Sequence, residues 1–140
     1  MIKKIFKISI ILFFLPNILH AKSKYIEAGI NLYNKNKFEE AKFKFEQDIV
    51  YNPKSELSYL YLSKIFKKLD KKNLQEKNLN TVILLNPKNE EAILSLAKLK
   101  LDSSDYKKSK ELNERLSSFC NNFCNESKKL KIEIENLSKK

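Results

Sequence analysis

One short sequence occurs twice in the chain at a spacing that few folds use. Residues 52–56 are Asn-Pro-Lys-Ser-Glu and residues 86–90 are Asn-Pro-Lys-Asn-Glu. This Asn-Pro signal therefore repeats with a period of 34 residues, the distance from Pro53 to Pro87. An internal period of this size is typical of stacked helix-turn-helix units, each of which buries its apolar face against the next. In both places we expect the asparagine to cap the following helix and the proline to occupy its first turn, where no amide donor is needed.

The residues before the first of these signals follow helical spacing. Two apolar stripes fit two successive helices: Tyr25, Ala28, Leu32 and Tyr33, then Phe38, Ala41, Phe45 and Ile49. Gly29, the only glycine of the chain, falls inside the first helix, where glycine costs about 1 kcal/mol relative to alanine. We therefore expect Gly29 at a close approach of two helices that a side chain would block.

These residues resemble the tetratricopeptide repeat (TPR) family. That family places a bulky residue, a Leu-Gly pair, an aromatic, a Gly-Asp-Tyr-x-x-Ala turn, a second aromatic and a proline at matching positions. The match is closest in residues 22–55 and looser in the next two units. In the second unit Ser63 replaces the glycine and Gln75 replaces the alanine. In the third unit Lys100 and Asn113 stand at aromatic positions.

One more amphipathic stretch follows the third unit, at about residues 125–138. Leu130, Ile134 and Leu137 share one of its faces, and lysines and glutamates cover the rest. A terminal helix with a polar outer face is expected, because the last unit of a stack would otherwise leave its apolar face in water. We predict an all-α α-solenoid of seven helices and no strand in residues 22–140: repeats at about 22–55, 56–89 and 90–121, then the capping helix.

Residues 1–21 have the anatomy of a secretory signal peptide. Three lysines precede residues 8–15, which are almost entirely apolar, and a helix-breaking Pro-Asn pair and the small residue Ala21 follow. The apolar core is shorter than the about 20 residues that a membrane-spanning helix needs. We predict export to the periplasm of a Gram-negative bacterium, with an uncleaved inner-membrane anchor as the alternative.

The charge of the exported chain stays positive. Removal of residues 1–21 takes away three lysines, no acids and the only histidine, and lowers the net charge from +11 to +8. A basic chain can bind nucleic acid, a membrane surface or acidic proteins, and the export signal argues against nucleic acid. The remaining charge fits an acidic protein or peptide partner, a peripheral membrane contact, or a solvated surface that reflects a composition rich in Lys, Asn and Ile.

Cys120 and Cys124 are the only cysteines, and they lie between the third repeat and the capping helix. An even pair in an exported chain predicts a disulfide. It would fix the capping helix to the preceding repeat and stabilise the fold by at most about 2 kcal/mol, because the ring is small. A metal site, a catalytic thiol–disulfide pair and two buried thiols stay open as alternatives.

The exported chain lacks the residues that common catalytic sites need. Without histidine it cannot form a Ser-His-Asp or Cys-His nucleophile, and one glycine cannot build a phosphate-binding loop. The neighbouring carboxylates at 39–40 and 90–91 point apart on a helix and suit its first turn. We predict no catalytic residue, no cofactor and no metal, and hence not an enzyme.

The TPR resemblance also implies a binding surface, because the first helix of each pair lines the concave side of such a stack. The residues that this places in the groove are Tyr33, Asn34, Leu60, Lys64, Lys67 and Lys98, with Ile26, Ile30, Lys68, Leu94 and Leu101 beside them. We expect the lysines at 64, 67 and 98 to form a basic strip next to Tyr33 that binds an extended or helical segment with acidic residues. Only Lys64 and Asn34 match the clamp with which some family members hold a terminal carboxylate, so that specificity is not carried over.

The sequence therefore predicts a non-enzymatic TPR-type scaffold or adaptor of the cell envelope that binds a protein or peptide partner in its concave groove. A structural subunit of an envelope complex and a peripheral membrane-surface protein that uses the basic face are the alternatives. Self-association as a homo-oligomer stays open, because three repeats are close to the minimum for a stable stack.

Overall fold

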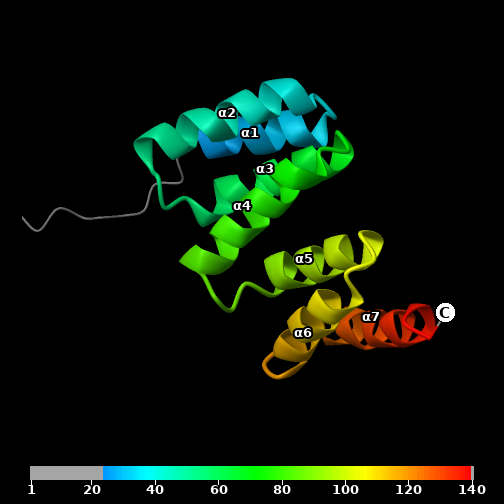
Figure 1. Ribbon diagram of the computed structural model, residues 1–140. Helices are drawn as coiled ribbons and strands as arrows, with labels where there is room; N and C mark the ends of the chain where they lie inside the picture. The colour runs from blue at the N-terminus through cyan, green and yellow to red at the C-terminus, as the bar shows by residue number, and fades with distance from the viewer. Residues whose placement is uncertain (1–23, 140) are drawn as a thin grey trace, which may run out of the picture.

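The computed structural model describes residues 24–139, and this part of the chain contains seven α-helices and no strand (Figure 1). The helices are α1 (Lys24–Asn34), α2 (Phe38–Tyr51), α3 (Glu56–Lys68), α4 (Lys72–Leu85), α5 (Glu90–Asp102), α6 (Tyr106–Ser117) and α7 (Cys124–Leu137). The predicted all-α architecture of seven helices is therefore confirmed. The predicted signal peptide at residues 1–21 lies outside the described residues.

The helices form three antiparallel pairs that stack in chain order (Figure 1). α1 pairs with α2, α3 with α4 and α5 with α6, while α2 packs against α3 and α4 packs against α5. α1 also contacts α3, α5 contacts α7, and an ion pair between Lys64 and Glu91 joins α3 to α5, so the first helices of the pairs follow one another along one face. The turns within pairs lie on the right of Figure 1, and the α2–α3 and α4–α5 loops lie on the left.

The three turns within pairs share one conformation at one spacing. Asn36, Asp70 and Ser104 have positive φ angles of 58°, 52° and 61°, and they recur with the same period as the two Asn-Pro signals. The amide after each of them donates to the carbonyl five residues before it, as Lys37 does to Leu32 at 3.0 Å. This is the Schellman arrangement, which ends a helix with one left-handed residue that is usually glycine. None of the three left-handed residues is glycine, and the asparagine and aspartate of the first two turns tolerate the left-handed region.

The loops between pairs differ from the sequence prediction in one respect. Asn52 and Asn86 end α2 and α4 instead of beginning the next helix, and the N-caps of α3 and α5 are Ser55 and Asn89. The amides of these two N-cap residues donate to the carbonyls of the asparagines at 3.0 Å, so each proline lies inside a four-residue turn. The fixed φ of proline suits the second position of such a turn. The N-cap is left to a residue that can accept, and the Asn89 side chain accepts from the Ala92 amide at 2.8 Å.

The close approach expected at Gly29 is present in the structure. A Cβ atom at this position would lie 2.8 Å from two ring carbons of Phe45, a fully buried residue of α2. By the 34-residue period, the next pair has Ser63 and Leu79 at these positions. A larger residue on the first helix therefore faces a smaller one on the second, and the two sizes compensate each other.

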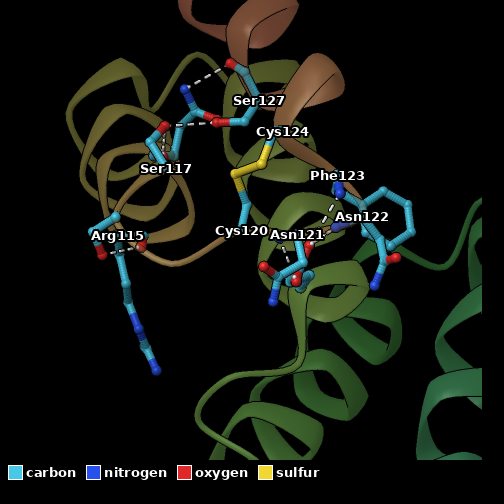
Figure 2. The surroundings of a disulfide bond; sticks show 11 residues. Arg115, Ser117, Cys120, Asn121, Asn122, Phe123, Cys124 and Ser127 are labelled. Atoms are coloured by element: carbon cyan, nitrogen blue, oxygen red, sulfur yellow. Dashed lines mark hydrogen bonds between the residues drawn. A yellow bond between two sulfur atoms is a disulfide. The ribbon is translucent and has the colours of Figure 1, made fainter.

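In the third pair the corresponding core position is polar and holds the last helix. Asn113 occupies the position of Phe45 and Leu79, and it is buried in α6. It donates to the carbonyl of Ser127 in α7 at 3.0 Å, and the Ser127 hydroxyl donates to the Asn113 side-chain oxygen at 2.9 Å. The hydroxyl of Ser117 lies 2.7 Å from that of Ser127 (Figure 2). This network explains why the third pair departs from the apolar pattern of the first two.

α7 occupies the place of a first helix in a fourth pair, and its polar side faces water. Lys131 takes the repeat position of Gly29, Ser63 and Ala97 in the three pairs. The residue at this position is small in each pair, because the second helix packs against it. Lys131 is exposed, whereas its neighbour Leu130 is 1% exposed and belongs to the core. This arrangement fits the capping role expected of a terminal helix.

Candidate functional site

Two regions contain the residues that the sequence singles out. One is the face formed by α1, α3 and α5, and the other is the loop between α6 and α7. Because consecutive first helices follow one another along this face, residues at equal repeat positions form rows across it. Two rows contain Tyr33 and the three predicted lysines: Ile30, Lys64 and Lys98, and then Tyr33, Lys67 and Leu101.

The rows place exposed lysines beside an aromatic cluster. Lys67 and Lys98 are exposed, and none of the ion pairs found within residues 24–139 involves them. Tyr33 is half-buried, and its ring packs edge-on against Phe38 and Tyr61, with centroid distances of 5.6 and 5.3 Å. The aromatic ring is thus fixed in place, while the lysine side chains extend into solvent.

Lys64 differs from the other two lysines because it has a partner in the structure. Its Nζ lies 2.7 Å from Oε1 of Glu91 and 4.9 Å from the centroid of the Tyr61 ring. The Lys64 and Glu91 side chains are 31% and 36% exposed, so water reaches the pair and its contribution is about 0–1 kcal/mol. The sequence predicts Glu91 only as a first-turn acid and does not reveal this contact between pairs. A ligand carboxylate at Lys64 has to displace Glu91.

Leu60 belongs to the core and is not an open groove contact. It is 6% exposed and lies in the same buried cluster as Leu94 and Leu101. The difference from the sequence expectation arises because apolar residues at these positions fill the space between consecutive helices of the stack. Asn34, at the end of α1, is exposed. Of the six predicted groove residues, Tyr33, Asn34 and the three lysines are therefore accessible, and Leu60 is not.

The loop between α6 and α7 carries both cysteines (Figure 2). The structure has a disulfide between Cys120 and Cys124, with their Cα atoms 5.3 Å apart. By the 34-residue period, the cysteines take the positions of Asn86 and Glu90 in the preceding loop. Because Cys124 is the first residue of α7, the bridge ties the start of this helix to the residues that follow α6.

The same loop is held by a second set of contacts, which the sequence did not reveal. The carboxylate of Glu90 accepts hydrogen bonds from the three amides of residues 121–123, at 2.9, 2.9 and 3.0 Å. Desolvation raises the pKa of Glu90, but the three amides lower it and prevail, so this pKa lies below the ordinary value of 4.5. One repeat earlier, Glu56 accepts from Nδ2 of Asn86 at 3.0 Å. The first residue of α3 thus holds the α4–α5 loop, and the first residue of α5 holds the α6–α7 loop.

Glu90→Gln is expected to flatten the acid side of the pH–stability profile. Since the folded chain lowers the pKa of Glu90, its carboxylate stabilises the fold above the unfolded-state value of 4.5. This stabilisation is lost as the pH falls through the lower folded-state value. Wild type should therefore lose more stability than Glu90→Gln between about pH 5 and pH 3, measured by urea denaturation. Glu133→Gln, at an exposed acid of α7, is the control; equal slopes for wild type and Glu90→Gln would contradict the assignment.

One buried carboxyl group lies away from both regions, between α2 and α3. Asp48 is fully buried, its Oδ2 accepts from the Ser58 hydroxyl at 2.6 Å, and its Oδ1 has no hydrogen-bond partner within the described residues. The equivalent contact between α4 and α5 is apolar, with Val82 and Ala92 both fully buried. Because protein covers the Asp48 carboxyl, it is not presented to a ligand.

The described part of the chain contains neither a metal-binding cluster nor a membrane-spanning helix. Within residues 24–139, no group of three or more His, Cys, Asp or Glu side chains is placed to hold a metal ion. No helix in this range has the length and apolarity needed to cross a bilayer. The arrangement offers a lysine-rich helical face and a loop held by a disulfide and a carboxylate.

No protein-family model matches the sequence, and no curated protein matches it significantly. Solved structures do match it. The first TPR domain of Spaghetti (RPAP3), bound to the HSP90 peptide SRMEEVD, is 18% identical with a TM-score of 0.75, over 83% of this chain and 94% of that one. The TPR2B domain of yeast Sti1, in a pHsp70 complex, is 16% identical with a TM-score of 0.73, over 82% and 99%.

The Yersinia enterocolitica type III secretion chaperone SycD, in complex with a peptide of the translocator YopD, is also similar. It is 16% identical with a TM-score of 0.73, over 83% of this chain and 92% of that one. At these identities the likeness concerns the fold alone. The 34-residue period, the stacked helix pairs and the structural matches together show that the chain has the tetratricopeptide-repeat fold.

Proposed function

We propose that this chain is a non-enzymatic protein-interaction module of the cell envelope. In this proposal residues 1–21 direct export to the periplasm, and the face lined by α1, α3 and α5 binds a peptide or partner segment that carries acidic residues. Support for the binding mode comes from the fold and from the three similar structures, each of which is a complex with a peptide or partner.

The observation that carries the proposal is the arrangement of side chains in rows across this face. Lys67 from α3 and Lys98 from α5 are exposed, and the ring of Tyr33 from α1 is held at the end of one row. An acidic segment that lies across the first helices meets a lysine from each of two pairs. Charge-assisted hydrogen bonds to carboxylates are about twice as strong as neutral ones. The net charge of +8 without residues 1–21 adds long-range attraction for an acidic partner.

Charge reversal of two lysines tests the binding face. Lys67→Glu with Lys98→Glu should weaken the complex with the partner by at least about tenfold, because two attractive contacts become repulsive. Partners are recovered from the envelope fraction by cross-linking, identified by mass spectrometry, and then titrated. Lys77→Glu with Lys107→Glu reverses two exposed lysines of α4 and α6 and should leave the affinity unchanged. Equal recovery of partners by the two double variants would overturn the proposal.

Export and the disulfide are tested together by the intact mass of the protein from its native cells. Loss of residues 1–21, with two thiols that alkylate only after reduction, is expected in an oxidising compartment. The short Cα separation of Cys120 and Cys124, 5.3 Å, supports the bond. A full-length chain whose cysteines alkylate without reduction would contradict both expectations and redirect the search for partners to the inside of the cell.

A further inference from the structure

A second surface, away from the face of α1, α3 and α5, combines exposed apolar side chains with lysines. Val50 and Leu84 are 76% and 81% exposed, more than any other large apolar residue within residues 24–139, and Tyr51 is 74% exposed. Val50 and Leu84 are equivalent by the 34-residue period and lie near the C-terminal ends of α2 and α4. Lys54 and Lys88, which are equivalent in the same way, are exposed in the loops that follow. We call these five residues the loop edge, because they lie in or next to the α2–α3 and α4–α5 loops on the left of Figure 1.

The acids of the neighbouring helix starts do not neutralise these lysines toward solvent. The Glu56 carboxylate accepts from an asparagine of the next loop, and that of Glu90 accepts from the amides of residues 121–123. Both groups are therefore directed at the protein. The nearest exposed acid along α2 is Glu46, one turn before Val50. The loop edge thus presents apolar side chains framed mainly by positive charge.

The chain enters the fold at this edge. Tyr25, the second residue of α1, stacks on Tyr51 with ring centroids 5.5 Å apart and ring planes 5° apart. The sequence before Lys24 therefore joins the molecule here, and it includes the apolar residues 8–15. As long as residues 1–21 are attached and their apolar segment is in a membrane, the loop edge is the part of the fold that the chain joins first.

We infer that the loop edge rests on the surface of an anionic lipid bilayer. Val50 and Leu84 reach between the headgroups, Tyr51 lies at their level, and Lys54 and Lys88 bind lipid phosphates. Membrane-surface elements bind in this way, with apolar side chains in the interface and lysines that extend toward anionic headgroups. Tyrosine is enriched at this depth because one end of its side chain is apolar and the other is polar.

Two alternatives agree less well with the structure: a second copy of the chain as the occupant of the loop edge, and the α3–α4 turn as the surface that meets the membrane. A second copy of the chain is disfavoured because the core of a protein interface is depleted of lysine, and a lysine follows each apolar residue of the loop edge. The α3–α4 turn carries four exposed lysines at 67, 68, 71 and 72. Its exposed large apolar residue, Leu74, is only 41% exposed. The inference concerns a different surface from the proposed peptide-binding face, so each can fail without the other.

A single tryptophan can test the inference, because the chain contains none. Leu84→Trp should show blue-shifted emission and quenching by brominated lipid on vesicles of phosphatidylglycerol and phosphatidylethanolamine, and neither change on phosphatidylcholine alone. The emission reports only the surroundings of residue 84, so the test can use the chain with or without residues 1–21. Phe43→Trp, at a residue of α2 that is 56% exposed, is the matched control and should keep the emission of a water-exposed ring. Equal changes at both positions, or none at Leu84, would overturn the inference, as would a lipid-independent shift that grows with protein concentration.

The lysines are tested in the Leu84→Trp chain by the lipid concentration that gives half of the emission shift. Lys54→Gln with Lys88→Gln should raise this concentration by at least about tenfold, since each lysine near an anionic surface contributes on the order of 1 kcal/mol. Lys71→Gln with Lys72→Gln removes the same charge from the α3–α4 turn and should have a smaller effect. An equal effect of the two pairs would show that net charge alone attracts the membrane, and the assignment to the loop edge would fall.

Discussion

Replacement of Gly29 by serine is expected to lower the free energy of unfolding by about 2 kcal/mol, and Phe45→Leu in the same chain should restore most of it. A Cβ atom at position 29 meets the Phe45 ring at 2.8 Å, and overpacking of this kind costs about 1–3 kcal/mol. The double replacement copies the Ser63–Leu79 pair of the next repeat, in which the serine hydroxyl donates to the Leu60 carbonyl at 2.6 Å. Phe45→Leu alone should cost about 1 kcal/mol, because it leaves a small space in the core.

Urea denaturation of the four chains of this double-mutant cycle measures the coupling between the two positions, which should be about 2 kcal/mol. Asn31→Ser, at an exposed residue of the same helix, is the control and should change the stability by less than about 0.5 kcal/mol. Strictly additive effects of Gly29→Ser and Phe45→Leu would show that the glycine is a tolerated residue and not a requirement of helix packing.

The second large effect is expected at the buried pair of Asp48 and Ser58. Asp48→Val with Ser58→Ala copies the Val82–Ala92 contact of the next interface. It should raise the free energy of unfolding by about 2 kcal/mol, because apolar residues of similar volume often replace buried charged or polar groups with a gain of about 1–4 kcal/mol. Ser58→Ala alone should lower it by about 2 kcal/mol, because the carboxyl then has no donor among the described residues.

The opposite signs of the single and double replacements distinguish this explanation from a general effect of core mutation. Both chains are compared with wild type by urea denaturation at neutral pH. Asp102→Val, at an exposed acid at the end of α5, controls for the loss of charge and should change the stability by less than about 0.5 kcal/mol. A double variant less stable than wild type would mean that the Asp48 carboxyl contributes a favourable contact.

Much of the fold could be predicted because its strongest determinants are local and periodic. The return of Asn-Pro one period later located the units, and the solitary Gly29 located a close contact between two helices. The spacing of Leu130 and Ile134 located α7, because both residues fall on the face that the helix buries. Each of these signals is visible on a single helix without knowledge of its neighbours.

The parts that the sequence did not reveal depend on which residues meet across the stack. The pairing of Lys64 with Glu91 requires the offset between consecutive pairs, which no single-helix pattern contains. The burial of Leu60 has the same origin, since helical phase alone puts this residue on the same side as exposed lysines. The exposure of Lys67 and Lys98, in contrast, follows from helical phase and was expected.

The helix caps show a different kind of limit. Asn-Pro is favoured both at helix starts and in turns, so the composition of the loop did not decide between the two. Asp48 gave no signal at all, because an acid on a helix surface is usually exposed. Its burial became visible only with α3 in place, when the Ser58 hydroxyl came within 2.6 Å.

The lysine at position 131 also affects how copies of the chain could assemble. Stacks of like units can add further copies head to tail and grow into filaments, because each end exposes a surface shaped for the next unit. At the C-terminal end this surface is a groove of about 370 Å³ between α6 and α7, and Lys131 is part of its lining. A helix from another copy in this groove would bury the lysine ammonium group, at a cost of several kcal/mol. Lys131 is therefore expected to disfavour the stacking of another copy on α6 and α7.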